Sequence, residues 1–140
     1  MKKCTLLFFA AAFALALQPM TTAAPIVQAQ VNIKKVSVQR ALELFGGTMR
    51  KWPNGTRIAV ILQDPEALAN KAFASRLGIP HNQFVAAINK NINDGADIKI
   101  VSSANQVLIA VAATPNSAGI YSATQYVENS NGVRLLEIEQ

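Results

Sequence analysis

The chain has little of the chemistry on which most enzymes and metal proteins depend. Its 140 residues include one cysteine, Cys4, and one histidine, His81. Cys4 lies in a predicted leader, so the rest of the chain has no thiol for a disulfide, a thiolate metal site or cysteine catalysis. His81 has no second histidine or carboxylate cluster at metal-binding spacing, and we expect it to cap a helix or lie at the surface. The sequence predicts no cofactor.

Charged and aromatic residues are also scarce, at 15% and 6% of the chain. The net charge is +5, but the basic residues stand singly or in pairs such as Lys34-Lys35, without an aromatic surface for stacking bases. We therefore expect no nucleic-acid partner. No Gly-x-Ser-x-Gly or Ser-x-x-Lys motif accompanies the serines, so the sequence also predicts that the protein is not an enzyme.

The N-terminus has the pattern of a secretory signal peptide. Lys2 and Lys3 precede an apolar run over 6–17, which is shorter than the roughly 20 residues that a membrane-spanning helix needs. A small-residue region follows, and Val27-Gln28-Ala29 fits a cleavage site. We predict a signal peptide over 1–29, a single domain over 30–140, and a periplasmic or secreted protein without stable membrane insertion. The alternative is a leader that stays uncleaved as an anchor.

Apolar spacing and capping residues predict that helices and strands alternate along the chain. Helices are expected from Ser37, Asp64-Pro65, Pro80 and Ser103, and strands over 57–62, 98–101, 120–122 and 133–138. The segment 103–113 also fits a buried strand, but its alanines favour a helix. The alternation predicts an α/β fold, namely a small three-layer domain with a mainly parallel sheet.

The helix expected after the first of these strands has the clearest start signal. Asp64 is a preferred N-cap residue and Pro65 is favoured at the first helical position. Gly78 is a typical C-terminal stop. The predicted apolar face consists of Leu68, Ala69, Ala72, Phe73 and Leu77.

Polar side chains gather near the predicted carboxyl ends of the strands, where open α/β sheets bind their ligands. They are Gln63, Asn70, Lys71, Ser102, Ser103 and Asn105. These six residues are our candidate ligand-binding residues, and their alternative role is that of solvated loop and cap residues. Trp52 and Tyr121 are candidates for a binding surface or, alternatively, for packing.

Two segments resemble a known family. Phe45-Gly46, followed by Trp52-Pro53-Asn54-Gly55 and an apolar strand, resembles the opening of the second lobe of periplasmic phosphate-binding proteins. These proteins are the substrate receptors of phosphate ABC transporters. The segment 115–121 is similar to the family's Pro-Gly-Ser/Ala-Ile-Gly-Tyr signature, with the Gly-Ile order inverted. The resemblance implies one lobe of a type II periplasmic binding protein.

The resemblance also implies an oxyanion site after the first strand, where the family has an arginine and a Ser-Gly-Thr-type loop. Here the segment 62–67 has neither, and it contains two carboxylates, Asp64 and Glu66. These carboxylates would repel phosphate at a helix start, or they serve only to stabilise the helix. We therefore carry two hypotheses. One is a solute-binding module for phosphate or another small anion, and the other is a ligand-free interaction or scaffold protein of the envelope. The candidate protein partners are a second copy of the chain and an envelope protein.

Overall fold

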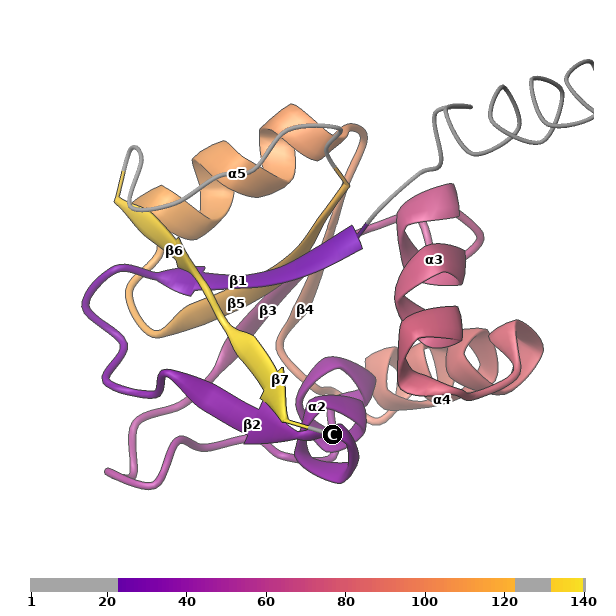
Figure 1. Cartoon of the computed structure of the whole chain (residues 1–140), viewed down its shortest axis with the longest axis horizontal. Coiled ribbons are helices and arrows are strands. Elements are labelled where there is room, and N and C mark those ends of the chain that lie inside the picture. The colour runs from indigo at the N-terminus through magenta and orange to yellow at the C-terminus, as the bar shows by residue number, and fades with distance from the viewer. Residues whose placement is uncertain (1–22, 123–131, 140) are drawn as a thin grey trace, which may run out of the picture.

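The computed structural model describes residues 23–122 and 132–139, and its centre is a mixed β-sheet (Figure 1). In these residues the sheet order is β4 (Ile98–Val101), β3 (Ala59–Gln63), β5 (Ser117–Ser122), β1 (Ala23–Gln28) and β6 (Val133–Leu135). β3 pairs parallel with β4 and β5, whereas β1 pairs antiparallel with β5 and β6. All the strands of this sheet except β1 therefore run in one direction, which confirms the predicted mainly parallel sheet.

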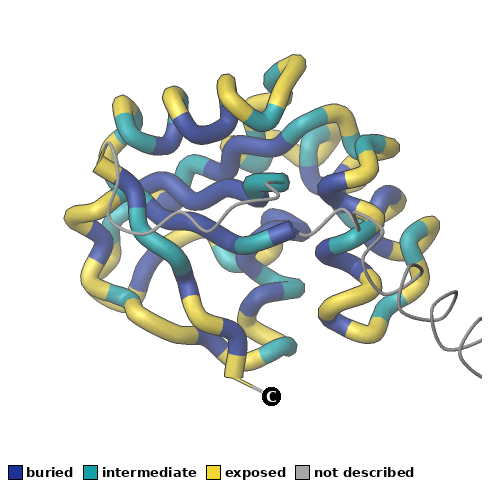
Figure 2. The backbone as a smooth tube through the Cα atoms, turned by 45° about the horizontal axis from the view of Figure 1, so that its top comes forward, coloured by how far each residue is buried: buried dark blue, intermediate teal, exposed yellow. Residues whose placement is uncertain are grey.

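Helices cover both faces of the sheet, as the predicted three-layer α/β domain requires. They are α2 (Val38–Gly46), α3 (Leu68–Leu77), α4 (His81–Asn93) and α5 (Ala104–Ala113). Successive side chains of β3 enter different cores because a strand points them to opposite faces. Ile61 packs in a cluster with Val107 and Val111 of α5, while Val60 and Leu62 belong to the cluster that includes α2, α3 and α4. Figure 2 shows buried residues concentrated along the strands.

Local signals placed three of the helices correctly. The Ser37 side chain accepts a hydrogen bond from the N–H of Arg40 and caps α2. Pro80 precedes α4, as expected. Ser103 caps α5 by accepting from the N–H of Gln106, so the helix favoured for this segment is confirmed over the strand. None of the helices in the described part of the chain is long and apolar enough to cross a bilayer.

The start predicted for α3 is wrong. The helix begins at Leu68, after Ala67, and no side chain caps it. Asp64 instead accepts a hydrogen bond from the N–H of Glu66 at 2.9 Å, which closes a local turn before the helix. The apolar face is also shifted, because Leu68 is 65% exposed while Asn70 is fully buried.

The last predicted strand, over 133–138, is two strands in two sheets. β6 belongs to the main sheet, and β7 (Glu137–Glu139) pairs parallel with β2 (Lys35–Ser37), which the sequence analysis did not predict. The break falls at Leu136, whose side chain is buried and whose N–H donates to the carbonyl of Pro25. Burying this leucine and pairing both flanking segments requires the chain to change sheets there.

Strand β1 lies inside the segment that the sequence analysis assigned to the signal peptide. Its Ile26 and Val27 are fully buried, and the strand lies between β5 and β6. Cleavage after Ala29 would remove this strand from the sheet. The signal peptide remains a prediction, and β1 gives a physical reason to place its end before Ala23.

Gly119 allows α5 to lie close to the sheet. A Cβ atom at this position would be 2.8 Å from the carbonyl oxygen of Ile61 and 2.9 Å from a methyl group of Val107. The glycine of the signature-like segment is therefore required by packing of the helix on β5.

We expect Gly119→Ala to lower the free energy of unfolding by about 1–3 kcal/mol, because the added methyl group overlaps a backbone oxygen that has little room to move. Denaturant titration measures this difference. Gly46→Ala is the matched control: a Cβ there meets only Ala87 at 3.8 Å. Equal losses of unfolding free energy in the two variants would contradict the packing role of Gly119.

Candidate functional site

The carboxyl ends of β3 and β4 bring most of the predicted ligand-binding residues to one edge of the sheet. Gln63 ends β3 and is paired with Val101, the last residue of β4. Ser102 and Ser103 follow directly, and α3 and α5 begin beyond this edge. We call it the strand-end edge; it comprises the ends of β3, β4 and β5 and the starts of α3 and α5. Its position agrees with where ligands of open α/β sheets bind.

Asn70 is the buried polar residue of this edge. Its side chain is fully buried, and its amide nitrogen donates to the carbonyls of Asp64 at 2.8 Å and Gln63 at 3.4 Å. Because two carbonyls face the amide nitrogen, the orientation of the amide group is set and Oδ1 points away from them. Oδ1 has no hydrogen-bond partner among the described residues. A buried acceptor without a donor is costly, so this atom requires a donor from a water molecule or a ligand.

The serines of the edge have local partners. Ser102 donates from its hydroxyl to Oε1 of Gln106 at 2.7 Å, and Ser103 accepts from the N–H of Gln106. Both residues therefore stabilise the start of α5, which matches the capping alternative. Asn105 is exposed on the first turn of the same helix.

The start of α3 can attract an anion, although carboxylates lie nearby. The N–H groups of its first turn have no side-chain acceptor, and the helix dipole places partial positive charge there. Lys71 is exposed on this turn. Asp64 and Glu66, both exposed, oppose an anion, as the sequence analysis expected.

Arg76 is a cation of this edge that the sequence analysis missed. Its guanidinium donates at 3.2 Å to the carbonyl of Ala23, the residue that pairs with Ser122 at the end of β5. Arg76 lies 53 residues from Ala23 in the sequence, so no local pattern indicated their contact. Lys71 is in the first turn of α3 and Arg76 in its last turn, so the two cations lie at opposite ends of the helix.

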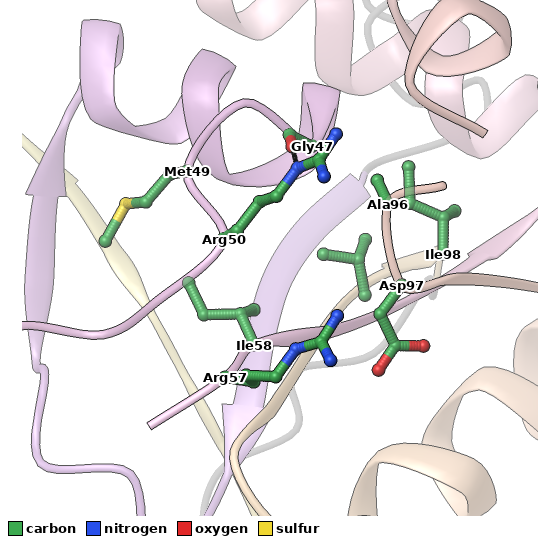
Figure 3. Close-up of a pocket in the computed structure, with 9 residues that line it drawn as sticks. Gly47, Met49, Arg50, Arg57, Ile58, Ala96, Asp97 and Ile98 are labelled. Carbon is green, nitrogen blue, oxygen red and sulfur yellow. Dashed lines mark hydrogen bonds between the residues drawn. The ribbon is translucent and has the colours of Figure 1, made fainter. Parts of the chain in front are cut away.

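Two further arginines surround a small hollow elsewhere on the molecule (Figure 3). Arg50 and Arg57 line it together with Asp97, and the side chain of Arg50 also donates to the carbonyl of Gly47 at 3.4 Å. The cavity has a volume of about 10 Å³. It has room for about one water molecule, so it is too small to enclose an anion such as phosphate.

The described residues contain no group of three or more histidine, cysteine, aspartate or glutamate side chains that could hold a metal ion. Nε2 of His81 is buried at the start of α4 and has no hydrogen-bond partner among these residues. Tyr121 is half-buried near the end of β5, and Trp52 is buried.

No family model and no curated protein matches the sequence. Solved structures do match the fold. PstS from Borrelia burgdorferi is 17% identical over 85% of this chain and 47% of its own, with a TM-score of 0.67. An ABC-type phosphate transport receptor from Vibrio cholerae is 14% identical over 86% of this chain and 47% of its own, with a TM-score of 0.61. The fold is that of about half of a phosphate-binding protein.

Another structure with this fold is a phosphate-binding protein from Stenotrophomonas maltophilia, which is 12% identical over 85% of this chain and 39% of its own, with a TM-score of 0.56. The chain thus spans less than half the length of these proteins, which is consistent with a single lobe. The resemblance to the phosphate-binding family stated from the sequence is confirmed at the level of the fold.

Proposed function

We propose that the protein is a secreted or periplasmic solute-binding module, without enzymatic activity, that holds a small oxyanion at the strand-end edge. The observation that carries this proposal is the buried Oδ1 of Asn70, which has no donor in the described part of the chain and lies beside an uncapped helix start. The likeness in fold to phosphate-binding proteins supports it.

The chemistry of the edge favours an oxyanion that carries a proton. The N–H groups at the start of α3 and the side chain of Lys71 would donate to the anion's oxygens. Oδ1 of Asn70 accepts only, so an oxyanion that bonds to it must carry an O–H group. Phosphate retains a proton near neutral pH and sulfate does not. We therefore propose phosphate as the ligand and expect sulfate to bind less well.

The affinity should be low, because one lobe offers only part of the contacts that two closing lobes would supply. The carboxylates of Asp64 and Glu66 lower it further. A second copy of the chain facing the strand-end edge would complete the enclosure, and a homodimer is part of this proposal.

Thermal unfolding of the purified protein in phosphate and in sulfate at equal ionic strength tests the proposal. We expect a saturable rise of the melting temperature in phosphate, since a ligand that binds only the native state stabilises it by RT ln(1 + [L]/Kd). Lys71→Ala should reduce this rise. Lys34→Ala, which removes an exposed lysine from the loop after β1, should leave it unchanged. Equal shifts in both salts and in all variants would show general salt stabilisation and contradict the proposal.

The second candidate function is a ligand-free interaction or scaffold protein of the envelope. Leu68, which is 65% exposed, opens α3, and Ile100, 41% exposed, lies on the edge strand β4 near its end. Exposed apolar side chains are typical of interaction surfaces when they lie together. Sedimentation of the wild type and of Leu68→Ser tests this function: self-association that the variant loses, without any anion effect on melting, would favour it over solute binding.

A further inference from the structure

A larger cavity lies at the opposite end of the sheet from the strand-end edge. Its volume is about 170 Å³, and it opens between the loop after β1, the turn after Lys51 and the turn before β5. Four residues with side-chain amides line it, Gln30, Asn32, Asn54 and Asn116, together with the apolar residues Val31, Ile33, Trp52 and Pro53. We call it the amide pocket. Among the residues that the structure describes, no charged one lines it.

Hydrogen bonds hold the walls of the amide pocket in place. The indole N–H of Trp52 donates to the carbonyl of Asn116 at 3.0 Å, which ties the two turns together. Asn116 has a φ of 60°, a left-handed conformation that asparagine tolerates better than most residues. On the other side, the guanidinium of Arg134 donates to the carbonyls of Val31 and Ile33. The pocket is therefore formed before a ligand arrives, which lowers the entropic cost of binding.

The amide groups retain free hydrogen-bonding capacity. Among the described residues, the side chains of Gln30, Asn32 and Asn116 have no hydrogen-bond partner. Oδ1 of Asn54 accepts from the N–H and the hydroxyl of Thr56, so its amide nitrogen is left to donate elsewhere. Each free amide group can both donate and accept.

We propose that the amide pocket binds a neutral, polyhydroxylated ligand, namely a single sugar ring. A hydroxyl group both donates and accepts, as a free amide does. An oxyanion would have no countercharge among the described residues that line the pocket. Pro53, which is exposed, would lie against the C–H groups of the ring, next to the small accessible part of Trp52. The cavity, at about 170 Å³, has room for one small ring that remains partly exposed. This site is independent of the proposed oxyanion site.

Ligand-observed saturation-transfer NMR with the purified full chain, titrated with glucose and with N-acetylglucosamine, tests the proposal. We expect saturable binding of at least one of these sugars. The double variant Gln30→Ala/Asn32→Ala should weaken it about tenfold, as the loss of two hydrogen bonds implies. The matched control Asn82→Ala/Gln83→Ala removes the same two amide types from the exposed start of α4 and should leave binding unchanged.

Three results would overturn the proposal: no sugar binding even at high millimolar concentration, binding that is equal in both double variants, or acetamide binding in place of the sugars. Competition with phosphate separates this site from the other one. Sugar binding that persists in saturating phosphate supports an independent pocket, and displacement by phosphate contradicts it. Failure of the phosphate melting experiment leaves this test unaffected.

Discussion

A chain that begins at Gln30 is expected not to fold, whereas a chain that begins at Ala23 is expected to unfold cooperatively. Removing β1 exposes both β5 and β6, the strands with which it pairs. It also removes Ile26 and Val27, which are fully buried on opposite faces of the sheet. Each such side chain contributes about 1.5–3 kcal/mol on burial. Together with the lost strand pairing, this loss of burial free energy is comparable to the roughly 5–15 kcal/mol that stabilises a small domain.

Circular dichroism during heating compares the two chains directly. We expect a sigmoidal transition for residues 23–140 and a flat, unstructured trace for residues 30–140. Val27→Asp in the longer chain is the companion variant, because it places an unpaired charge in the core without shortening the chain. A cooperative transition of residues 30–140 at the same midpoint would show that β1 is dispensable.

The burial of β1 also predicts where the leader would be cleaved. If the leader is removed on export, the N-terminus of the mature protein should lie at or before Ala23, because the folded domain needs β1. Mass spectrometry of the exported protein measures this position. A mature chain that starts at Gln30 and is folded would restore the boundary predicted from the sequence.

The sequence alone predicted the elements whose signals are local. The caps Ser37 and Ser103 and the apolar spacing of α4 act within one helix, so no knowledge of the rest of the fold is needed. β1 was missed because its apolar residues continue the apolar character of the leader and because Pro25 argues against a central strand. In the structure, the carbonyl of Pro25 faces β6 and accepts a hydrogen bond from the N–H of Leu136. The regular pairing of β1 with β6 begins one residue later, at Ile26. The missing N–H therefore interrupts no ladder bond to β6.

The candidate site was predictable only in part, for the same reason. The strand ends at Gln63 and before Ser102 follow from local pattern, and parallel pairing then brings them to one edge. The burial of Asn70 was not predicted, because a polar residue gives no sequence signal of burial; in the structure its amide nitrogen donates to the carbonyls of Gln63 and Asp64. The contact of Arg76 with β1 depends on a strand that was not predicted.

The second large effect is expected from Phe73→Ala in α3, which should lower the free energy of unfolding by about 3–5 kcal/mol. Phe73 is fully buried and packs edge-on against Phe45 of α2, with ring centroids 5.1 Å apart. It also packs against Phe84 of α4 at 6.1 Å. One side chain thus joins three helices, and its removal leaves a cavity that none of them can fill without moving.

Leu68→Ala provides the control on the same helix. The sequence pattern placed Leu68 and Phe73 on one apolar face, but Leu68 is largely exposed and its truncation should change stability by less than about 0.5 kcal/mol. Denaturant unfolding of both variants decides between the pattern and the structure, and similar losses of stability would contradict the exposed position of Leu68. Because Phe73 anchors the helix that carries Asn70, Lys71 and Arg76, its loss should also weaken phosphate stabilisation, whereas Leu68→Ala should preserve it.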